Sequence, residues 1–334
     1  MTEAYKPGVA IVGCGLIGQK RVKGLNNAKL VVCSDLVLAR AQAIALPKGA
    51  EVVGDWHLAV NHPEVRIVIV ATTNESLAEV SLLAVQSGKH VLVEKPAARN
   101  CAELDLVIEA ASRKNVQVRV GFNHRYHPAF LKARQLIDSG ELGDLMYIRG
   151  RYGHGGRVGY DREWRADPII SGGGELIDQG VHLIDLSRWI LGDFTKVEGF
   201  AHTYYWDMSV DDNAFMLLQT SKKQTAFLHV SCTEWKNLFS FEIFGKQAKL
   251  HIEGLGGSYG VERLAFYKML PQMGPPETMI WEYPMGDNSW ELEFNEFLDD
   301  IRLQRTPSAN LLDARAALSI VEHIYKEQKN DHHT

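Results

Sequence analysis

The sequence predicts an α/β protein with an N-terminal Rossmann domain on a parallel sheet and a C-terminal α+β domain with a large, mostly antiparallel open sheet. Three observations lead to this prediction. Apolar runs alternate with helical sequence through residue 120, a glycine-rich turn follows the first run, and strand-like runs separated by short turns begin at residue 145. A chain of 334 residues is long enough for two domains, which we place at residues 1–122 and 123–334.

The first domain is expected to alternate strands with helices. The expected strands are residues 9–12, 30–34, 52–53, 66–71, 90–93 and 116–120. The expected helices run from the glycine turn to about residue 26 and over residues 37–46, 75–87 and 102–114, with Gly88 as a C′ residue. The β-branched run at 66–71 is typical of a strand buried on both faces. Strands separated by helices imply a parallel sheet with right-handed crossovers.

The second domain opens with a helix at residues 128–139 and then changes pattern. Its expected strands are residues 146–151, 197–204, 214–219, 224–234, 240–244 and 248–253. Helical sequence resumes at residues 290–302 and 312–328. Several of these strands are separated only by short turns, which indicates antiparallel pairing. Residues 331–334 are expected to form a frayed end and not a metal site.

Composition and charge narrow the class of protein. The chain is 46% apolar and 23% charged, as in a soluble globular protein with a large core. A net charge of −5 gives no electrostatic reason to expect nucleic acid or an anionic membrane as partner. The four cysteines form no CxxC pair and are expected to be reduced. Without a signal-peptide pattern at the N-terminus or an apolar run of membrane-spanning length, we expect a cytoplasmic protein.

The glycine-rich turn has the spacing of a dinucleotide-binding loop. Gly13, Gly15 and Gly18, with Leu16 and Ile17 between the last two, follow a strand and open a helix. Such glycines permit a tight turn and let backbone N–H groups approach a pyrophosphate. The alternative is a plain glycine turn with an N-capping aspartate.

The second strand ends at Asp35, and this residue is the basis for predicting which coenzyme binds. Its carboxylate can accept hydrogen bonds from the adenosine ribose and would repel a 2′-phosphate. We therefore expect NAD as cofactor and regard NADP as less favoured. Arg40 lies close enough in sequence to weaken that preference.

Two further segments supply groups suited to hydride transfer at a carbinol carbon. Lys95 lies in Glu94-Lys95-Pro96, directly after an apolar run, and Asp178 and His182 follow the glycines at 172–174. On a regular helix, residues 178 and 182 share one face, with residue 185 between them. A histidine held by a carboxylate can accept the hydroxyl proton while a cation stabilises the oxygen. The alternatives are a structural histidine, a solvated helix pair, or a metal site, for which we find no convincing further ligand; no metal is expected.

Together these motifs resemble a known family. Gly13-x-Gly15-x-x-Gly18, Glu94-Lys95-Pro96, Gly121-Phe122-x-x-Arg125-Tyr126 and Gly172-Gly173-Gly174-x-Leu176-x-Asp178-x-Gly180-x-His182-x-x-Asp185 are similar in order and spacing to the glucose–fructose oxidoreductase/inositol dehydrogenase (Gfo/Idh/MocA) family. The resemblance implies oxidation or reduction of sugars, inositols or nucleotide-linked sugars with a nicotinamide. It also implies that Lys95 contacts the reacting hydroxyl, that His182 transfers the proton, and that Asp178 is its acidic companion.

The resemblance further implies a rigid lysine turn at Pro96, through a cis peptide bond. It also implies a homodimer or homotetramer formed through the C-terminal sheet. One departure concerns Thr72-Thr73-Asn74-Glu75-Ser76-Leu77, where many relatives read Thr-Pro-Asn-x-x-His. Thr72 and Asn74 are still expected to line the cofactor, together with Glu94 and Lys95.

The expected substrate is a sugar that carries an anionic group, such as a nucleotide-linked sugar. Residues 149–165, which precede the helix expected to carry Asp178 and His182, are rich in side chains that bind phosphates and polyols. The expected substrate contacts are Lys95, Asn123, Arg125, Arg151, His154, Trp164, Arg165, Asp178 and His182. The opposing interpretation is that the arginines of this stretch pair with Asp161, Glu163 and Asp167. The alternative functions are a dehydrogenase of neutral inositols, a glycoside lyase or hydrolase with transient redox chemistry, and a non-catalytic NAD sensor.

Overall fold

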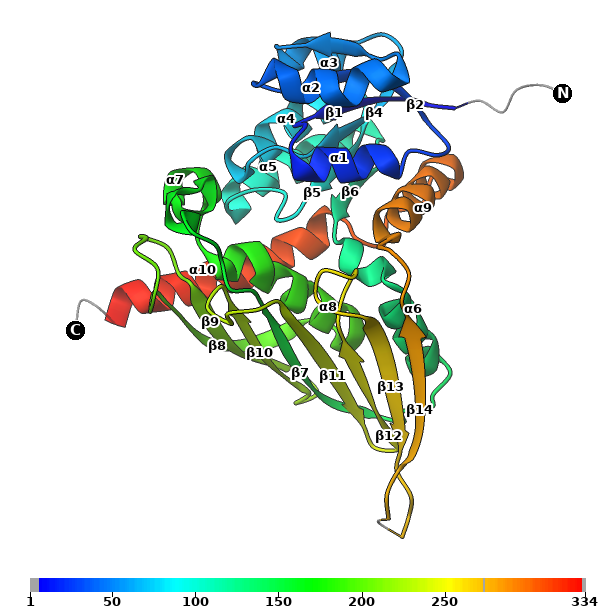
Figure 1. Cartoon of the computed structure of the whole chain (residues 1–334), viewed down its shortest axis with the longest axis vertical. Coiled ribbons are helices and arrows are strands. Elements are labelled where there is room, and N and C mark those ends of the chain that lie inside the picture. Colours follow the sequence, from blue (N-terminus) through cyan, green and yellow to red (C-terminus); the bar gives the residue numbers. More distant parts are fainter. Residues whose placement is uncertain (1–5, 273, 332–334) are drawn as a thin grey trace, which may run out of the picture. The chain divides into compact units, whose positions relative to one another are not determined.

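The computed structural model describes residues 6–272 and 274–331, and the chain divides into two compact units (Figure 1). One unit runs up to Phe122 and includes Trp290–Arg315. The other contains Asn123–Ser289 and the chain from Ala316 onward. Residues 332–334 of the expected frayed end lie outside the described residues. None of the helices in the described part of the chain has the length and apolarity needed to cross a bilayer.

The first unit is built on a six-stranded, wholly parallel sheet in the order β3-β2-β1-β4-β5-β6. Its strands are β1 (Gly8–Val12), β2 (Lys29–Ser34), β3 (Glu51–Val53), β4 (Val65–Val70), β5 (His90–Glu94) and β6 (Val118–Gly121). Its helices are α1 (Leu16–Lys23), α2 (Leu38–Ala45), α3 (Trp56–Asn61), α4 (Asn74–Gln86), α5 (Cys101–Lys114) and α9 (Ser289–Leu303). The strand order reverses between β1 and β4, where ligands of open α/β sheets bind. The Rossmann prediction is confirmed; only α3 among helices α1 to α5 was not expected.

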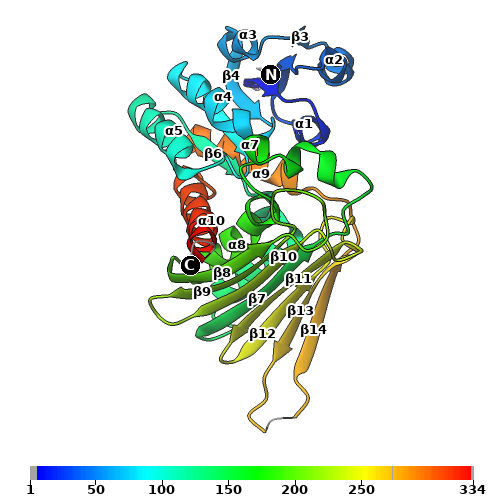
Figure 2. The same cartoon turned by 90° about the vertical axis from the view of Figure 1, so that its left-hand side faces the viewer.

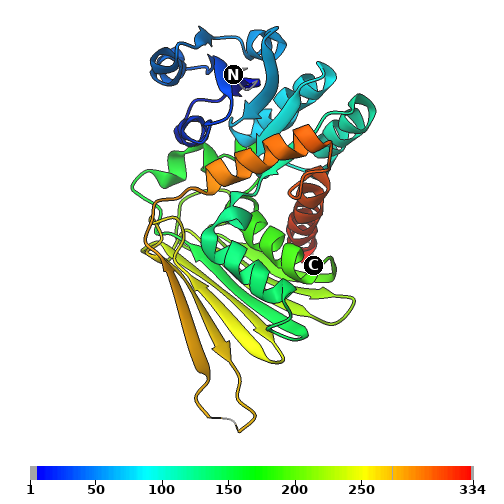
Figure 3. The ribbon, with the colours of Figure 1, turned by 90° about the vertical axis from the view of Figure 1, so that its right-hand side faces the viewer.

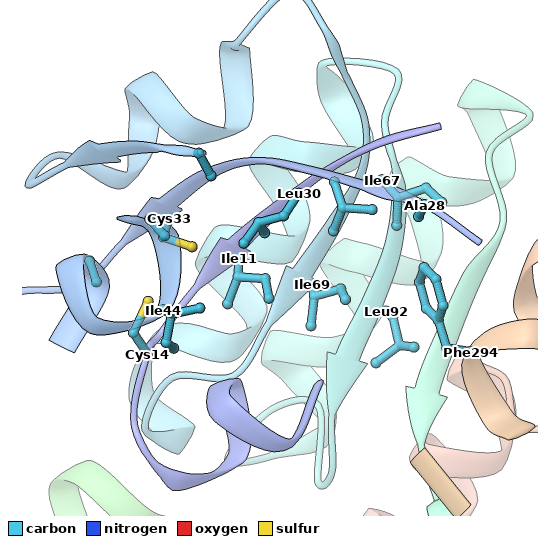
Figure 4. Packing of buried hydrophobic residues seen from close by; sticks show 14 of the residues in the cluster. Ile11, Cys14, Ala28, Leu30, Cys33, Ile44, Ile67, Ile69, Leu92 and Phe294 are labelled. Atoms are coloured by element: carbon cyan, nitrogen blue, oxygen red, sulfur yellow. The ribbon is translucent and has the colours of Figure 1, made fainter. Parts of the chain in front are cut away.

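The core of the first unit explains why α9 belongs to it. Ile11, Ile69 and Leu92 from three strands pack with Phe294 of α9 in one cluster (Figure 4). Buried ion pairs reinforce this packing. The Arg21 guanidinium contacts Glu94 at 2.6 Å and Glu293 at 2.5 Å, and Arg119 pairs with Asp300. The division therefore differs from the expected boundaries, which placed the whole of residues 123–334 in the second domain.

The second unit is built on an eight-stranded sheet in the order β14-β13-β12-β11-β7-β10-β9-β8 (Figure 2). Its strands are β7 (Leu145–Gly153), β8 (Phe194–His202), β9 (Asn213–Thr220), β10 (Thr225–Ser231), β11 (Leu238–Gly245), β12 (Ala248–Glu253), β13 (Glu262–Lys268) and β14 (Glu277–Tyr283). All neighbouring strands are antiparallel except β7 and β10, which are parallel. The mostly antiparallel open sheet was predicted, but β13 and β14 were not.

Helices cover one face of this sheet. The helices α6 (Pro128–Asp138) and α8 (Val181–Leu191) lie along it (Figure 3), and the long helix α10 (Leu311–Asp331) enters this unit at Ala316. Along β7, Ile148, Gly150 and Tyr152 are buried, while Arg149 and Arg151 are exposed. This period-two alternation means that one face of the sheet packs on helices and the other does not.

Candidate active site

The glycine-rich turn of the first unit joins β1 to α1. At Gly13 φ is +93°, and a Cβ there would lie 2.4 Å from the carbonyl oxygen of Ala71. A Cβ at Gly18 would lie 2.2 Å from the carbonyl oxygen of Gly13, whereas a Cβ at Gly15 would meet no atom within 4 Å. The first glycine therefore allows the turn and the third allows close helix packing. The second leaves the backbone open at the N-terminus of α1, where dinucleotide folds bind pyrophosphate.

Asp35 is held at the carboxyl end of β2 by two backbone groups. One carboxylate oxygen accepts from the N–H of Cys14 at 2.7 Å, and the other accepts from the N–H of Val37 at 2.8 Å. A carboxylate has about four acceptor positions, so it can still accept from a ribose hydroxyl. The other residues expected near this part of the cofactor are Leu16, Ile17 and Arg40. Leu16, at the start of α1, is 69% exposed and is followed by Ile17, and Arg40 is exposed on α2. The residues present fit an NAD pyrophosphate and ribose.

The other expected cofactor residues have different surroundings. Thr72 is half-buried, and its hydroxyl donates to the carbonyl oxygen of Thr73 at 3.0 Å. Asn74 is buried in the first turn of α4. Glu94 is buried, and its carboxylate pairs with Arg21, so this group stabilises the interior of the first unit. Lys95 is half-buried directly after β5, and the Lys95–Pro96 peptide bond is cis, as the resemblance implied.

The segment that carries Asp178 and His182 is not a uniform α-helix. Residues Leu176–Gly180 form a π-helical turn, and α8 follows from Val181. Single π turns inside helices are frequent at functional sites. The prediction from sequence assumed 100° per residue, so it missed this wider turn. Asp178 accepts a hydrogen bond from the Nε of Arg165 at 3.0 Å.

The start of this segment is fixed by Asp211. Its side chain accepts from the N–H groups of Gly174 and Leu176 at 3.0 and 2.8 Å and from the hydroxyl of Tyr325 at 2.6 Å. A Cβ at Gly174 would lie 1.9 Å from the backbone oxygen of Asp211. A glycine is therefore required where these two backbone segments meet. The glycine run therefore fixes the start of the segment that carries Asp178 and His182.

His182 is buried, with 4% of its surface exposed, and its ring lies against another histidine. The centroids of His182 and His124 are 3.7 Å apart, with 32° between the ring planes, and the Tyr152 ring centroid is 6.2 Å from that of His182. Neither neighbour of His182 was predicted from the sequence. His124 lies inside the Gly121–Tyr126 motif, beside Arg125. Its position in that motif could have identified it as a candidate site residue.

Comparisons with known proteins identify the family of this chain. Residues 8–122 match the "Oxidoreductase family, NAD-binding Rossmann fold", and residues 130–251 match the "GFO/IDH/MocA C-terminal domain". The chain belongs to the Gfo/Idh/MocA family. The family's oxidoreductase class and its NAD-binding fold are those expected from the sequence.

Named relatives of this family are sugar and inositol dehydrogenases. The chain is 33% identical over 160 residues to levoglucosan dehydrogenase of Pseudarthrobacter phenanthrenivorans, covering 45% of this chain and 39% of that protein. It is 26% identical over 330 residues to the NAD⁺-dependent scyllo-inositol 2-dehydrogenase of Bacillus subtilis, covering 93% and 91%. The solved structure of a levoglucosan dehydrogenase in complex with NADH superposes with a TM-score of 0.86 at 22% identity, covering 97% and 98%. The likeness to that structure concerns the fold.

Several residues expected to bind substrate in this Gfo/Idh/MocA chain are engaged elsewhere. Arg125 is buried in a bidentate ion pair with Asp185, one of whose bonds measures 2.8 Å. Asn123 is buried, and its amide donates to the hydroxyl of Ser289 at 2.8 Å. Trp164 carries the guanidinium of Arg165 over its ring at 4.5 Å. These three contacts give each residue a structural function within the second unit.

Two further expected substrate contacts, Arg151 and His154, have other surroundings in the second unit. Arg151 lies on the face of the sheet opposite Tyr152, because neighbouring residues of β7 alternate in direction. It therefore does not join His182 within the second unit. His154 accepts the N–H of Gly156 at Nδ1, 3.0 Å away, and lies 3.4 Å from Glu175 through Nε2. Both ring nitrogens of His154 are thus engaged inside the protein.

Glu175 is a buried acid that the sequence analysis did not single out. It occupies an unspecified position of the family motif, and only 1% of its surface is exposed. It accepts a hydrogen bond from the Tyr160 hydroxyl at 2.7 Å in addition to its contact with His154. Burial, followed by the charge of Glu175, raises the pKa of Tyr160, so this phenol stays protonated and acts as a donor. Glu175 therefore links the loop after β7 to the segment that carries Asp178 and His182.

The carboxyl group of Asp211 provides a prediction on stability. Burial is the largest cause that raises its pKa from 3.8 to about 6. The folded state then binds the proton more tightly than the unfolded state, so this stabilisation is present below about pH 4 and is lost as pH rises through 6. The difference between the two pKa values corresponds to about 3 kcal/mol. We expect the unfolding free energy of the wild type, relative to Asp211→Asn, to fall between pH 4 and 6 in urea titrations.

Asp144 is the matched control for this experiment. Its pKa is lowered by a hydrogen bond from Lys246, and the group is exposed, so its contribution is small and of the opposite sign. Relative to Asp144→Asn, the wild type should therefore gain slightly as pH rises. A difference between the wild type and Asp211→Asn that does not change from pH 4 to 7 would contradict the prediction.

Proposed function

We propose that this protein is an NAD-dependent dehydrogenase that oxidises a secondary hydroxyl of a neutral sugar or cyclic polyol. The observation that carries the proposal is the glycine loop, in which Gly15 leaves the backbone open beside the fixed carboxylate of Asp35. Membership of an oxidoreductase family and the likeness to inositol and levoglucosan dehydrogenases support it. The compounds in these names, levoglucosan and inositol, carry no charge, which favours a neutral substrate.

The chemical steps are assigned to three side chains. NAD, when bound at the glycine loop and Asp35, supplies the hydride acceptor. His182 takes the hydroxyl proton, and Lys95 stabilises the negative charge that develops on the oxygen. Asp178 balances the charge of the protonated base and is itself oriented by Arg165. Ketone reduction uses the same groups in reverse.

The choice of a neutral substrate rests on the arginines of the second unit. Arg157 pairs with Glu163 at 2.7 Å, Arg165 with Asp178 at 3.0 Å, and Arg149 with Glu242 at 2.9 Å. An anionic substrate would have to displace carboxylates from these pairs. The nucleotide-linked or otherwise anionic sugar remains the second candidate, because the side chains of Arg157 and Arg165 are 67% and 34% exposed.

The test is a substrate screen followed by NADH absorbance. The neutral panel contains scyllo-inositol, myo-inositol and levoglucosan, and the anionic panel contains UDP-glucose and UDP-glucuronate, each with NAD and with NADP. We expect NADH to accumulate with a neutral compound and NAD. Higher kcat/KM for the anionic panel would replace the proposal by the second candidate. Substrate consumption without net NADH would indicate a lyase or hydrolase, and no turnover would favour a sensor.

We also propose that the uncovered face of the second sheet binds a second copy of the chain. Phe200, Leu217 and Phe227 lie on this face with 57, 46 and 48% of their surface exposed. Leu217 and Phe227 are direct partners across β9 and β10, and exposed apolar neighbours of this kind mark association surfaces. The resulting assembly is a homodimer or homotetramer, as the family resemblance implied.

Phe227→Arg is expected to reduce the mass of the particle to that of one chain, because a charge would be buried without a partner at the interface. Light scattering coupled to size exclusion measures this mass. Leu58→Arg is the control, since Leu58 is 61% exposed on α3 of the first unit. A wild-type protein that is already monomeric, or a Phe227→Arg protein with unchanged mass, would refute the proposal.

A further inference from the structure

Three aromatic side chains of the second unit are exposed at one end of its sheet. Tyr204 and Tyr205 lie in the loop after β8, and Trp235 lies in the loop after β10, with 66, 60 and 63% of their surface exposed. The rings of Tyr205 and Trp235 meet edge to face, 4.6 Å apart and at 86°. These three residues form what we call the aromatic corner. Aromatic surface of this extent is costly to leave in water.

The corner is held in place by buried polar groups. Asp212 is fully buried and accepts from the N–H groups of Tyr204, Tyr205 and Trp206 at 2.9, 2.8 and 3.0 Å. Although burial raises the pKa of Asp212, the hydrogen bond from the Asn213 amide and those from the three N–H groups lower it overall, so the anion that holds the loop persists. The indole N–H of Trp206 donates to the carbonyl oxygen of Cys232 at 3.0 Å. The loop is therefore ordered before any ligand arrives.

Trp235 adopts a backbone conformation that such residues seldom take. Its φ is +60°, in the left-handed region that costs a residue with a Cβ about 1–2 kcal/mol. A Cβ at Gly155 would lie 3.0 Å from the Trp235 backbone, and a Cβ at Gly156 would lie 2.4 Å from the Trp206 ring. The loop after β7 therefore packs closely against the two loops that carry the aromatic residues.

Ring contacts continue from the corner to the catalytic segment. Tyr205 contacts Trp206, and Trp206 contacts Tyr160, with centroids 5.2 and 5.7 Å apart. Tyr160 donates to Glu175, which stands three positions before Asp178 in the sequence. All of these residues belong to the second unit. The corner is therefore connected, through the buried side chains of Tyr160 and Glu175, to the segment that carries Asp178.

We propose that the aromatic corner is a subsite for a pyranose ring, namely the sugar unit next to the one that is oxidised. The C–H face of a pyranose is apolar and stacks on an aromatic face, while its hydroxyls reach polar groups such as the exposed Asp207 and Lys236 beside the corner. Three side chains offer about 500 Å² at most, below the roughly 800 Å² per partner of a stable protein interface. The size of the corner thus favours a small ring. The substrate class is then a disaccharide or glycoside, and this inference rests on the proposed function.

The test compares Trp235→Ala and Tyr205→Ala with Trp281→Ala, a tryptophan of β14 away from the corner. Binding of cellobiose and maltose to the full-length protein is followed by saturation-transfer NMR, with glucose and myo-inositol as single-ring controls. The KM of any turned-over compound is measured in parallel. We expect the two corner variants to weaken disaccharide binding about tenfold, the scale of one aromatic contact. Single-ring binding and the Trp281→Ala protein should stay within about twofold of wild type.

The outcomes separate the subsite from the proposed function. Disaccharide binding that depends on Trp235, without oxidation of any sugar or polyol, would support the subsite and refute the dehydrogenase. Oxidation with equal kinetics in all variants, or disaccharide binding indifferent to both corner residues, would overturn the subsite alone. A change of particle mass in Trp235→Ala would assign the corner to a contact between copies and would also overturn it. Because both side chains are exposed, neither substitution should prevent folding.

Discussion

Replacing Lys95 or His182 by alanine is expected to lower kcat by about 10²-fold or more, the scale for losing a positioned proton-transfer group, while NAD affinity barely changes. Lys95 follows directly on β5, and His182 lies on α8 behind the π turn. Neither replacement touches the glycine loop or Asp35. The measurement is steady-state NADH formation with the best neutral substrate, together with a fluorescence titration of NAD.

The double variant makes this prediction sharper. If Lys95 and His182 act on the same hydroxyl in one step, losing both should cost little more than losing either one. Independent functions would multiply the two losses. Arg151→Ala is the matched control, because Arg151 is a cation on the opposite face of the second sheet. Wild-type turnover in either single variant would remove that residue from the mechanism.

The fold was predictable from the sequence where a strand is buried along its whole length. The six runs of the first domain all became strands within about two residues of the expected ends. For most of them the reason is burial on both faces, which makes a strand continuously apolar, whereas the short β3 is exposed or half-buried. Strand β14 was missed for the opposite reason. Most of its residues are exposed, so it has neither an apolar run nor a clear alternation. The association of α9 with the first unit was also unpredictable, since it depends on Phe294 and on the buried pair of Arg21 with Glu293.

The candidate site was predictable as a set of residue types but not as a set of partners. Motif spacing selects Asp178 and His182, yet it cannot reveal that Arg165 contacts Asp178 or that His124 lies on the His182 ring. These contacts join segments far apart in the sequence. The internal partners of the loop after β7 were equally hidden: Arg157 pairs with Glu163, and His154 contacts Glu175. Side-chain chemistry alone does not distinguish a ligand contact from an internal ion pair.

Gly15→Val is expected to weaken NAD binding on the order of 100-fold or more while the thermal stability of the protein hardly changes. A Cβ at Gly15 meets no atom of the protein, and its φ of −71° is accessible to valine. The added side chain would therefore occupy only the space in which a pyrophosphate approaches the N–H groups of α1. Calorimetric titration of NAD and a melting curve measure the two quantities separately.

Gly18→Ala should produce the opposite combination. Its Cβ would lie 2.2 Å from the carbonyl oxygen of Gly13, so α1 would have to move away from the turn. Such overpacking costs about 1–3 kcal/mol and should appear as a lower melting temperature even without NAD. Gly54→Ala is the neutral control, because the nearest atom to its Cβ is 3.5 Å away on Leu38. If Gly15→Val bound NAD like the wild type, the open backbone at this turn would not be the coenzyme site, and the proposed redox activity would lose its main support.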